Sequence, residues 1–341
     1  MNLSERKKNI LKAVINENIK TAEPVSSSEL QRDYLKDVSS ATIRNELAAL
    51  EEMGFLSQPH TSSGRLPTVE AYKKYVSELM QEQKLSKSEA EKIKQNFSGK
   101  MKNISELLES TAKVISDASN YASIVSLGVT DNALISNVML VKLDDKQILA
   151  VIVTDIGTIK EIVKTNSISD DDVTAASKFM YSKLVGKRLA DVESVFDSMP
   201  DELKKYKNLF ESIVEAMIEK GHTDKNNMAF VGKEKLLDYP EYKDTEKFKS
   251  TLRALNDKST LRSITSPIDD NLEVSIKISD DDEGNYSVVT AKYKVNGKLA
   301  GTASVIGPVR MDYGKVVSIL KNVTNRLEEN IANNNKDDDE E

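Results

Sequence analysis

The chain has 341 residues and a formal net charge of −7, from 48 lysines and arginines against 55 aspartates and glutamates. This length exceeds one ordinary hydrophobic core, and the absence of cysteine together with only two distant histidines, His60 and His222, excludes disulfides and makes a zinc site improbable. With no apolar run of membrane-spanning length and no recognisable signal peptide, we expect a cytoplasmic protein of two or three domains without cofactor or metal.

Two helices are expected before residue 35. The first begins after Ser4, and its apolar side carries Ile10, Leu11, Val14, Ile15 and Ile19. Pro24 interrupts this pattern because proline lacks an N–H and restricts the residue before it. Ser26 and Glu29 then form a capping box, which predicts a second helix that runs to about Tyr34.

The third helix has two faces of different character. The stretch from residue 39 to residue 68 reads SSATIRNELAALEEMGFLSQPHTSSGRLPT. Its buried side is expected to carry Ile43, Leu47 and Leu50, which recur at helical spacing. The opposite side carries small residues beside one arginine and one amide: Ala41, Arg44, Asn45 and Ala48. Such a face can approach base edges closely and form hydrogen bonds with them.

A wing follows this helix. Gly54 is placed to end the helix, Phe55-Leu56 begins a strand, and residues 58–67 form a polar loop with Gly64 and Arg65 near its tip. The order of helix, short helix, turn, helix and wing predicts a winged helix-turn-helix that reads DNA. A three-helix bundle that packs against protein is the alternative, and the Arg44/Asn45 face favours DNA. The candidate DNA-binding residues are Ser39, Ser40, Thr42, Arg44, Asn45, His60, Thr61, Ser63 and Arg65.

The charge of this region is nearly balanced. Residues 1–75 hold 11 basic and 10 acidic side chains, so the excess negative charge lies further along the chain. Phosphate binding depends on the local potential rather than on the total charge. The electrostatic share of DNA affinity should therefore be modest, and specific contacts and dimerisation should supply the rest.

Helices and strands alternate in blocks after the wing. A helix starts at Thr68, polar residues follow from 81, and an amphipathic helix carries Ile104, Leu107, Leu108, Ala112 and Ile115. Three β-branched runs, 138–143, 148–154 and 158–164, predict an antiparallel meander, and a capped helix begins at Ser169. Residues 201–261 are read as helical. Strands over 286–295 and 299–306 flank Asn296-Gly297, a strong hairpin signal, and a last helix spans about 313–331.

Four segments resemble the HrcA family of heat-inducible transcription repressors. They are LSERKKNILKAVINENIKTAEPVSSSEL, ATIRNELAALEEMGFLSQPHTSSGRLPT, VGKEKLLDYPEYKDTEKFKS and GTASVIGPVRMDYGKVVSILKNVTNRL, and the resemblance covers nearly the whole chain. One segment departs from the family, because VSIKISDDDEG stands where a short I-G-x-E-N element is usual. The effect of this departure at Asp280 to Gly284 stays open.

The resemblance implies an α+β fold: an N-terminal winged helix-turn-helix followed by a GAF-like α+β domain that a mainly helical dimerisation insertion splits. The expected divisions are the winged helix over 1–80, a helical linker over 81–103, the GAF-like domain over 104–198 and 263–332, the insertion over 199–262, and a disordered acidic tail over 333–341. It also implies a homodimer that binds an inverted-repeat operator of the CIRCE type upstream of chaperone operons, released on heat stress and supported by the chaperonin GroEL.

No enzyme motif stands out. The Gly-rich phosphate loops and the G-x-S-x-G elbow are absent, and the acidic run 280–284 has the wrong spacing for a calcium loop, so a solvated turn is preferred. The three aspartates at 170–172 are expected to begin a helix rather than bind a metal. The alternative function is a ligand-sensing regulator whose GAF-like domain binds a small molecule; an enzyme with a regulatory winged helix is the least favoured.

Overall fold

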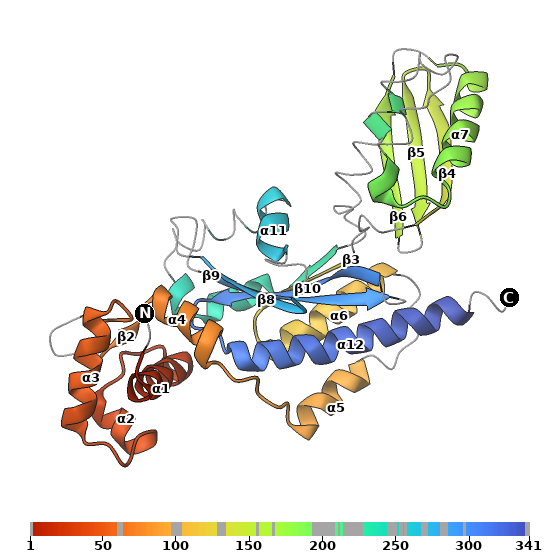
Figure 1. The fold of residues 1–341 in the computed structure, drawn as a ribbon. Coiled ribbons are helices and arrows are strands. Elements are labelled where there is room, and N and C mark those ends of the chain that lie inside the picture. The colour runs from red at the N-terminus through yellow and green to blue at the C-terminus, as the bar shows by residue number, and fades with distance from the viewer. Residues whose placement is uncertain are drawn as a thin grey trace.

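The computed structural model places the helices and strands in three groups (Figure 1). We call residues up to 79 the head, the elements around a five-stranded sheet the body, and the elements around a separate sheet the three-stranded unit. The structure describes residues 3–59, 64–96, 104–127, 134–154, 157–165, 168–192, 209–210, 212–213, 228–243, 251, 255, 258–266, 272–279, 286–295 and 298–337.

The head has the order of elements that the sequence predicts. These elements are α1 (Glu5–Thr21), α2 (Ser27–Asp33), α3 (Ser40–Glu52), β1 (Leu56–Ser57), β2 (Leu66–Pro67), α4 (Val69–Lys74) and the π-helical turn η1 (Tyr75–Leu79). Strands β1 and β2 pair antiparallel to form the base of the wing. The predicted apolar side of α1 is buried, with Ile10, Leu11, Val14 and Ile15 fully shielded from solvent.

Hydroxyl side chains begin the helices of the head. Ser4, Ser39 and Thr68 each accept a hydrogen bond from the backbone N–H three residues further on, which satisfies a donor that the helix leaves unpaired. At α2 the predicted capping box forms, because the Glu29 N–H donates to Ser26 Oγ (3.3 Å) and the Ser26 N–H donates to Glu29 Oε2 (2.8 Å).

Gly54 ends α3 as predicted. Its φ of +80° lies in the left-handed region, where glycine is strongly favoured. The Gly54 N–H donates to the Glu51 carbonyl (2.9 Å) and the Phe55 N–H to the Leu50 carbonyl (3.0 Å), so two otherwise unpaired carbonyls are satisfied. This turn directs the chain from α3 into the wing.

The linker is helical only in part, so the prediction of a helical segment over 81–103 is corrected. Residues 80–86 are extended and lie along the start of α12 (Tyr313–Asp337), where the Gln83 N–H donates to the Gly314 carbonyl (3.3 Å). A Cβ at Gly314 would lie 2.5 Å from the Gln81 carbonyl oxygen, so this close approach requires glycine. Helix α5 (Lys87–Asn96) follows, and residues 97–103 lie outside the described part.

The body is an antiparallel sheet in the order β7-β3-β10-β9-β8. Its strands are β3 (Ala122–Leu127), β7 (Met228–Val231), β8 (Val274–Ile278), β9 (Tyr286–Val295) and β10 (Lys298–Pro308). Helices α6 (Ile104–Ser119) and α12 cover one face, and α11 (Lys258–Thr265) lies on the other (Figure 1). The predicted hairpin is confirmed as β9 and β10, although its Asn296-Gly297 turn lies outside the described residues.

The predicted meander forms a sheet of its own. Strands β4 (Ile135–Asp144), β5 (Gln147–Thr154) and β6 (Gly157–Lys164) pair in chain order, and α7 (Asp170–Leu184) packs on one face. Leu209, Phe210 and Ile213 join the same hydrophobic cluster. The sequence analysis placed residues 104–198 in one domain that ends at 198. In the structure, β4, β5, β6 and α7 instead form a unit apart from the body sheet, and this unit continues to Ile213. The physical reason is that β4, β5 and β6 pair with one another and bury a core of their own under α7, without a strand from the body.

Two further expectations are corrected. Residues 201–261 were expected to be helical, but β7 lies within them and pairs with β3 at the edge of the body. The tail was expected to be disordered from residue 333, but α12 continues to Asp337, and residues 338–341 lie outside the described part. Extending an existing helix adds one hydrogen bond per residue, which explains why an asparagine-rich end can continue it.

A buried hydrogen bond joins α4 to α1 inside the head. Tyr72 and Asn18 are 3% and 5% exposed, and the Tyr72 hydroxyl donates to Asn18 Oδ1 (2.7 Å). Asn18 Nδ2 in turn donates to the Glu23 carbonyl at the end of α1 (3.0 Å). The packing of α4 is thus tied to the turn between α1 and α2.

Replacing Tyr72 by phenylalanine should destabilise the head. The Tyr72→Phe change leaves Asn18 Oδ1 buried without its donor, and such a loss costs about 1–3 kcal/mol. The midpoint of chemical denaturation, followed by a signal from the head, measures this effect. Tyr181→Phe is the matched control, because Tyr181 is 50% exposed and its loss should change stability by no more than about 0.5 kcal/mol. Equal midpoints for the two variants would contradict the role of this bond.

Candidate nucleic-acid interface

Helix α3 presents the two faces that the sequence predicts. Ile43, Leu47 and Leu50 are at most 4% exposed and pack into the core of the head. The opposite face is exposed along its length and consists of Ala41, Arg44, Asn45 and Ala48. Within the described residues no ion pair joins Arg44 to another side chain. The guanidinium and the Asn45 amide are therefore available to an external ligand, beside two residues small enough to let that ligand come close.

The predicted serine and threonine residues lie at the start of the same helix. Ser39 Oγ accepts the Thr42 N–H (3.1 Å) and lies 2.8 Å from Thr42 Oγ1. Ser40 Oγ lies 3.0 Å from Ser27 Oγ, which connects α3 to the first residue of α2. These hydroxyls thus hold the N-terminal end of α3 in place. Ser39 and Thr42 also lie on the helix that carries the Arg44/Asn45 face, at its positively polarised end.

Two glutamates of α3 near the Arg44/Asn45 face form ion pairs, whereas Glu52 at the end of the helix is exposed and has no ion pair among the described residues. Lys7 Nζ on α1 lies 2.6 Å from Glu46, and Arg65 Nε at the base of the wing lies 2.8 Å from Glu51. Each carboxylate would otherwise repel a polyanion that approaches α3. The pairs reduce this repulsion without adding net positive charge to the head.

Arg65 lies at the base of the wing rather than at its tip. Its N–H and carbonyl form two 2.9 Å hydrogen bonds with Val25, so the wing joins the segment between α1 and α2. Its side chain is only 18% exposed. Nε forms an ion pair with Glu51, but the orientation of its N–H does not meet the geometry of a hydrogen bond. Gly64 permits this close packing, since a Cβ there would lie 2.4 Å from the Val25 oxygen.

The predicted residues His60, Thr61 and Ser63 lie outside the described part of the chain. Their contacts with DNA stay a prediction. The structure does bring Arg65 and the N-terminal and exposed residues of α3 together in one domain, because β1, β2 and α3 share the core of the head.

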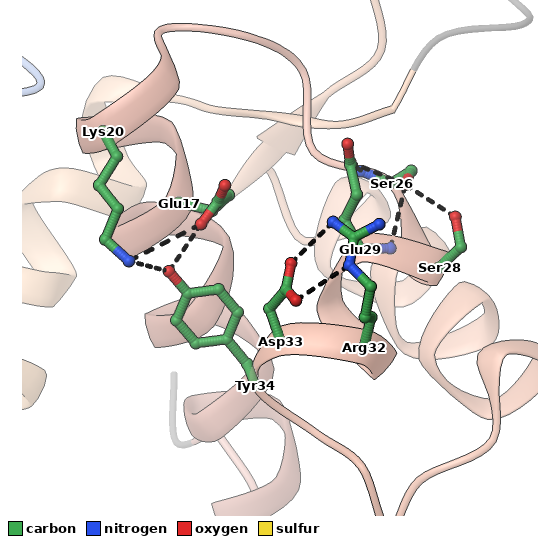
Figure 2. A network of polar contacts seen from close by, with 8 residues as sticks. All are labelled: Glu17, Lys20, Ser26, Ser28, Glu29, Arg32, Asp33 and Tyr34. Atoms are coloured by element: carbon green, nitrogen blue, oxygen red, sulfur yellow. Dashed lines mark hydrogen bonds and ion pairs between the residues drawn. The ribbon is translucent and has the colours of Figure 1, made fainter.

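A polar network that the sequence analysis did not identify fixes α2 against α1 (Figure 2). Lys20 Nζ donates to the Tyr34 hydroxyl (2.6 Å), which donates to Glu17 Oε2 (2.7 Å). Burial raises the pKa of Tyr34, so the hydroxyl stays protonated and able to donate at neutral pH. The spacing of Glu17 and Lys20 on α1 is the one feature of this network that the sequence shows. Their partner Tyr34 comes from the end of another helix and could not be identified from spacing.

The capping box and an ion pair complete the surface of α2 in the same view. Arg32 holds both carboxylate oxygens of Asp33, with donor–acceptor distances of 2.9 and 2.8 Å, and this pairing lowers the pKa of Asp33 (Figure 2). Because α2 contacts α3 through Ser27 and Ser40, a fixed α2 also fixes the start of the reading helix.

Across the described ranges, no group of three His, Asp or Glu side chains could hold a metal ion. No helix in that part of the chain is long and apolar enough to cross a membrane.

Comparisons with known proteins identify both parts of the chain. Residues 2–84 match the family model described as winged helix-turn-helix transcription repressor, HrcA DNA-binding, and residues 105–317 match the one described as HrcA protein C terminal domain. A crystal structure described as that of a hypothetical protein has the same fold, with a TM-score of 0.60 at 20% identity over 97% of this chain and 99% of that one.

Curated relatives match over almost their whole length. The heat-inducible transcription repressor HrcA of Clostridium botulinum is 34% identical over 98% of this chain and 99% of its own. The repressor of the same name from Clostridioides difficile is 35% identical over 94% of this chain and 97% of its own. With both domain models matched in order, the chain belongs to the HrcA family of heat-inducible transcription repressors.

Proposed function

We propose that the protein represses chaperone operons by binding an inverted-repeat operator of the CIRCE type as a homodimer. The observation that carries this proposal is the exposed Arg44/Asn45 face of α3, in a domain that matches the family's DNA-binding model. In this proposal α3 enters the major groove. Arg44 donates to a guanine, Asn45 pairs with an adenine, and the adjacent alanines permit close approach.

The backbone contacts are proposed for the two ends of this surface. Ser39, Ser40 and Thr42 lie at the N-terminal end of α3, where hydroxyls and backbone N–H groups favour phosphate. Arg65, with His60, Thr61 and Ser63, is proposed to contact phosphate or the minor groove from the wing. For Arg65 this contact requires an exchange, because its guanidinium would leave Glu51 for the DNA.

A dimer is proposed because one nearly neutral head offers limited affinity. Residues 1–75 carry 11 basic and 10 acidic side chains, so few counterions are released when a single head binds. Two joined heads bind two half-sites, and the second contact then occurs at a high effective concentration. The twofold symmetry of such a dimer also matches an inverted repeat.

The open face of the three-stranded unit is the proposed dimer contact. Helix α7 covers one face of this sheet, whereas the other face exposes Met139, Val141 and Ile162 to 46%, 43% and 53%. Leu149 links two of them, since it lies between Val141 and Ile162 in the ladder of paired strands. A continuous apolar ladder of this kind is unusual on a free surface and favours a second copy of the same sheet.

The sequence placed the dimer contacts in residues 199–262. Only part of that range is described, and its residues Leu209, Phe210 and Ile213 pack into the three-stranded unit. The proposal therefore extends the dimerisation module to include β4, β5 and β6. The GAF-like character of the body stays part of the same proposal, and an antiparallel sheet with helices on both faces is consistent with it.

Heat and the chaperonin GroEL are proposed to act on the same apolar surface. Separation or partial unfolding of the dimer on heating would expose the Met139/Val141/Ile162 face, and exposed apolar surface is what a chaperonin captures. The chaperonin would then return the chain to its DNA-binding form. Exposure of this face on heating would then explain both the release of the operator and the binding of the repressor to the chaperonin.

A small-molecule sensor is the alternative function. A hollow of about 290 Å³ lies between α6 and β7, lined by Ser105, Leu108, Glu109 and residues 228–231. This is smaller than the roughly 300–1,000 Å³ of usual ligand pockets, and it offers few converging polar groups. The hollow therefore favours the alternative less than the exposed face of α3 favours DNA.

Replacing Arg44 by alanine tests the proposed base contact of α3. A bidentate arginine–guanine contact contributes about 1–3 kcal/mol, so Arg44→Ala should weaken operator binding by roughly tenfold to a hundredfold. Stability should be unchanged because Arg44 is exposed. Gel shifts with an inverted repeat, a single half-site and an unrelated duplex measure the effect.

Arg188→Ala is the control for this variant, since it removes an exposed arginine from the three-stranded unit, outside the head. Equal operator affinity for Arg44→Ala and the parent would contradict the assigned reading face. A parent that binds the unrelated duplex as tightly as the inverted repeat would overturn the proposed function itself.

A charged residue in the apolar sheet face should separate the dimer. Val141→Asp introduces a carboxylate between two copies of the sheet, where its desolvation opposes association. Sedimentation should then detect monomers, and inverted-repeat affinity should fall at least about tenfold while half-site affinity is retained. Leu237→Asp is the matched control, because Leu237 is 51% exposed, against 43% for Val141, but lies in the body. A stable Val141→Asp dimer would move the interface elsewhere.

Modest heating should release the operator. A loss of about 1–2 kcal/mol of stability changes the active fraction several-fold, so a marginal fold responds within a narrow temperature range. Operator binding measured after heating should recover further with GroEL and ATP than without them, and GroEL without ATP is the control. This mechanism would be contradicted by operator binding that persists well above growth temperature, or by a recovery of binding that is the same with and without GroEL and ATP.

A further inference from the structure

One arginine of the body contacts the head directly. Arg310 lies in the loop between β10 and α12, and its side chain is only 13% exposed. Its Nη1 donates to the Ile19 carbonyl of α1 across 3.1 Å. The two residues are 291 positions apart in the chain, so this bond is a tertiary contact between the body and the head.

The acceptor belongs to the last turn of α1, where helix carbonyls lack partners. The next N–H that could reach the Ile19 carbonyl belongs to Glu23, and it donates to Thr21 Oγ1 instead (3.3 Å). A cation at a helix C-terminus also interacts favourably with the helix dipole. Arg310 therefore caps α1 from outside the head.

The rest of the guanidinium is held by the body. Arg310 Nε donates to Glu241 Oε1 and Nη2 to Glu241 Oε2 (3.2 Å), while the guanidinium carbon lies 5.5 Å from the centre of the Tyr239 ring. Tyr239 is itself fixed, because its ring stacks on Tyr121 at 5.2 Å and its hydroxyl donates to the Asn120 carbonyl (3.0 Å). One planar donor group thus joins the head to two segments of the body.

An aromatic contact and a linker hydrogen bond lie beside Arg310 where the head meets the body. Tyr72 of the head packs against Tyr313 at the start of α12, with ring centres 6.4 Å apart. The linker is bound to the same end of α12, since Gln83 Nε2 donates to Asp312 Oδ1 (2.7 Å). Aromatic packing permits rotation of one surface over another, whereas a hydrogen bond to a helix end specifies direction.

We propose that Arg310 is a positioning residue that sets the orientation of the reading head on the body. Arginine suits this role better than lysine, because only a planar fork can hold Glu241 with two nitrogens and present a third to the Ile19 carbonyl. In a dimer, the orientation of each head sets the distance between the two α3 helices. This consequence rests on the proposed inverted-repeat operator, whereas the orientation of the head does not.

The orientation is measured without DNA. The chain has no cysteine, so Lys36→Cys in the head and Asn325→Cys on α12, both exposed, accept a pair of spin labels as the only thiols. Doubly labelled chains are diluted with unlabelled protein, so that the measured distances are those between the two labels within one chain. Arg310→Ala should broaden that distribution, and Arg310→Lys should restore it only in part. Arg188→Ala is the control and should leave it unchanged.

The second measurement uses DNA. Arg310→Ala should weaken binding to the two-half-site duplex about tenfold, through a lower effective concentration of the second head, while single half-site affinity stays at the parent value. Inserting one or two base pairs between the half-sites should harm the variant less than the parent. Glu241→Gln keeps the side-chain shape but weakens the ion pair with Arg310. It should therefore also lower two-half-site affinity and reduce the effect of the inserted base pairs.

The outcomes separate the two proposals. A broadened distance distribution with parental two-half-site affinity and spacing preference supports the orientation of the head by Arg310 but refutes its consequence for the spacing of the two α3 helices. An unchanged distance distribution in Arg310→Ala overturns the positioning role. A loss of single half-site binding would indicate an unfolded head and would likewise refute it. If the parent binds two half-sites no better than one, the proposed function fails while the label distances still test the orientation of the head.

Discussion

The burial of one side of α3 is the constraint on which the reading surface depends. Ile43, Leu47 and Leu50 occupy the core of the head, and each apolar side chain of this size contributes about 1.5–3 kcal/mol when fully buried. Turning the helix about its axis would expose these residues. The residues that face outward, Arg44 and Asn45 among them, are therefore determined by packing, and the Gly54 turn determines where the wing begins.

Local chemistry made the head predictable. The Ser26/Glu29 capping box and Gly54 act within a few residues, so their partners can be read from the sequence, and the β9–β10 hairpin follows from its Asn-Gly turn in the same way. Strand β7 was not predictable, because a four-residue strand owes its existence to pairing with β3, more than a hundred positions earlier in the chain. The sequence also could not predict that β4, β5 and β6 form a sheet of their own, because the strand pattern is the same whether or not a meander joins another sheet.

The exposed face of α3 was predictable from the sequence, but the ion pairs beside it were not. Sequence spacing identified Arg44 as exposed, whereas Arg65 was expected near the wing tip and lies instead beside Glu51. The Arg65 side chain is 18% exposed and that of Glu51 32%, and in the proposed contact with DNA a charge-assisted bond to phosphate would replace this ion pair. In that proposal the ion pair keeps Arg65 ordered until phosphate replaces the carboxylate.

The near-zero charge of the head makes geometry more important than attraction. A strongly basic domain is held by phosphate contacts in many orientations, whereas a balanced one depends on a few directed bonds. Directed bonds from two heads form together only when both heads are correctly oriented. The contact between Arg310 and the Ile19 carbonyl, together with the linker on α12, restrains that orientation within each chain. In the proposed dimer, loss of this contact would misalign the two heads while each α3 stayed folded.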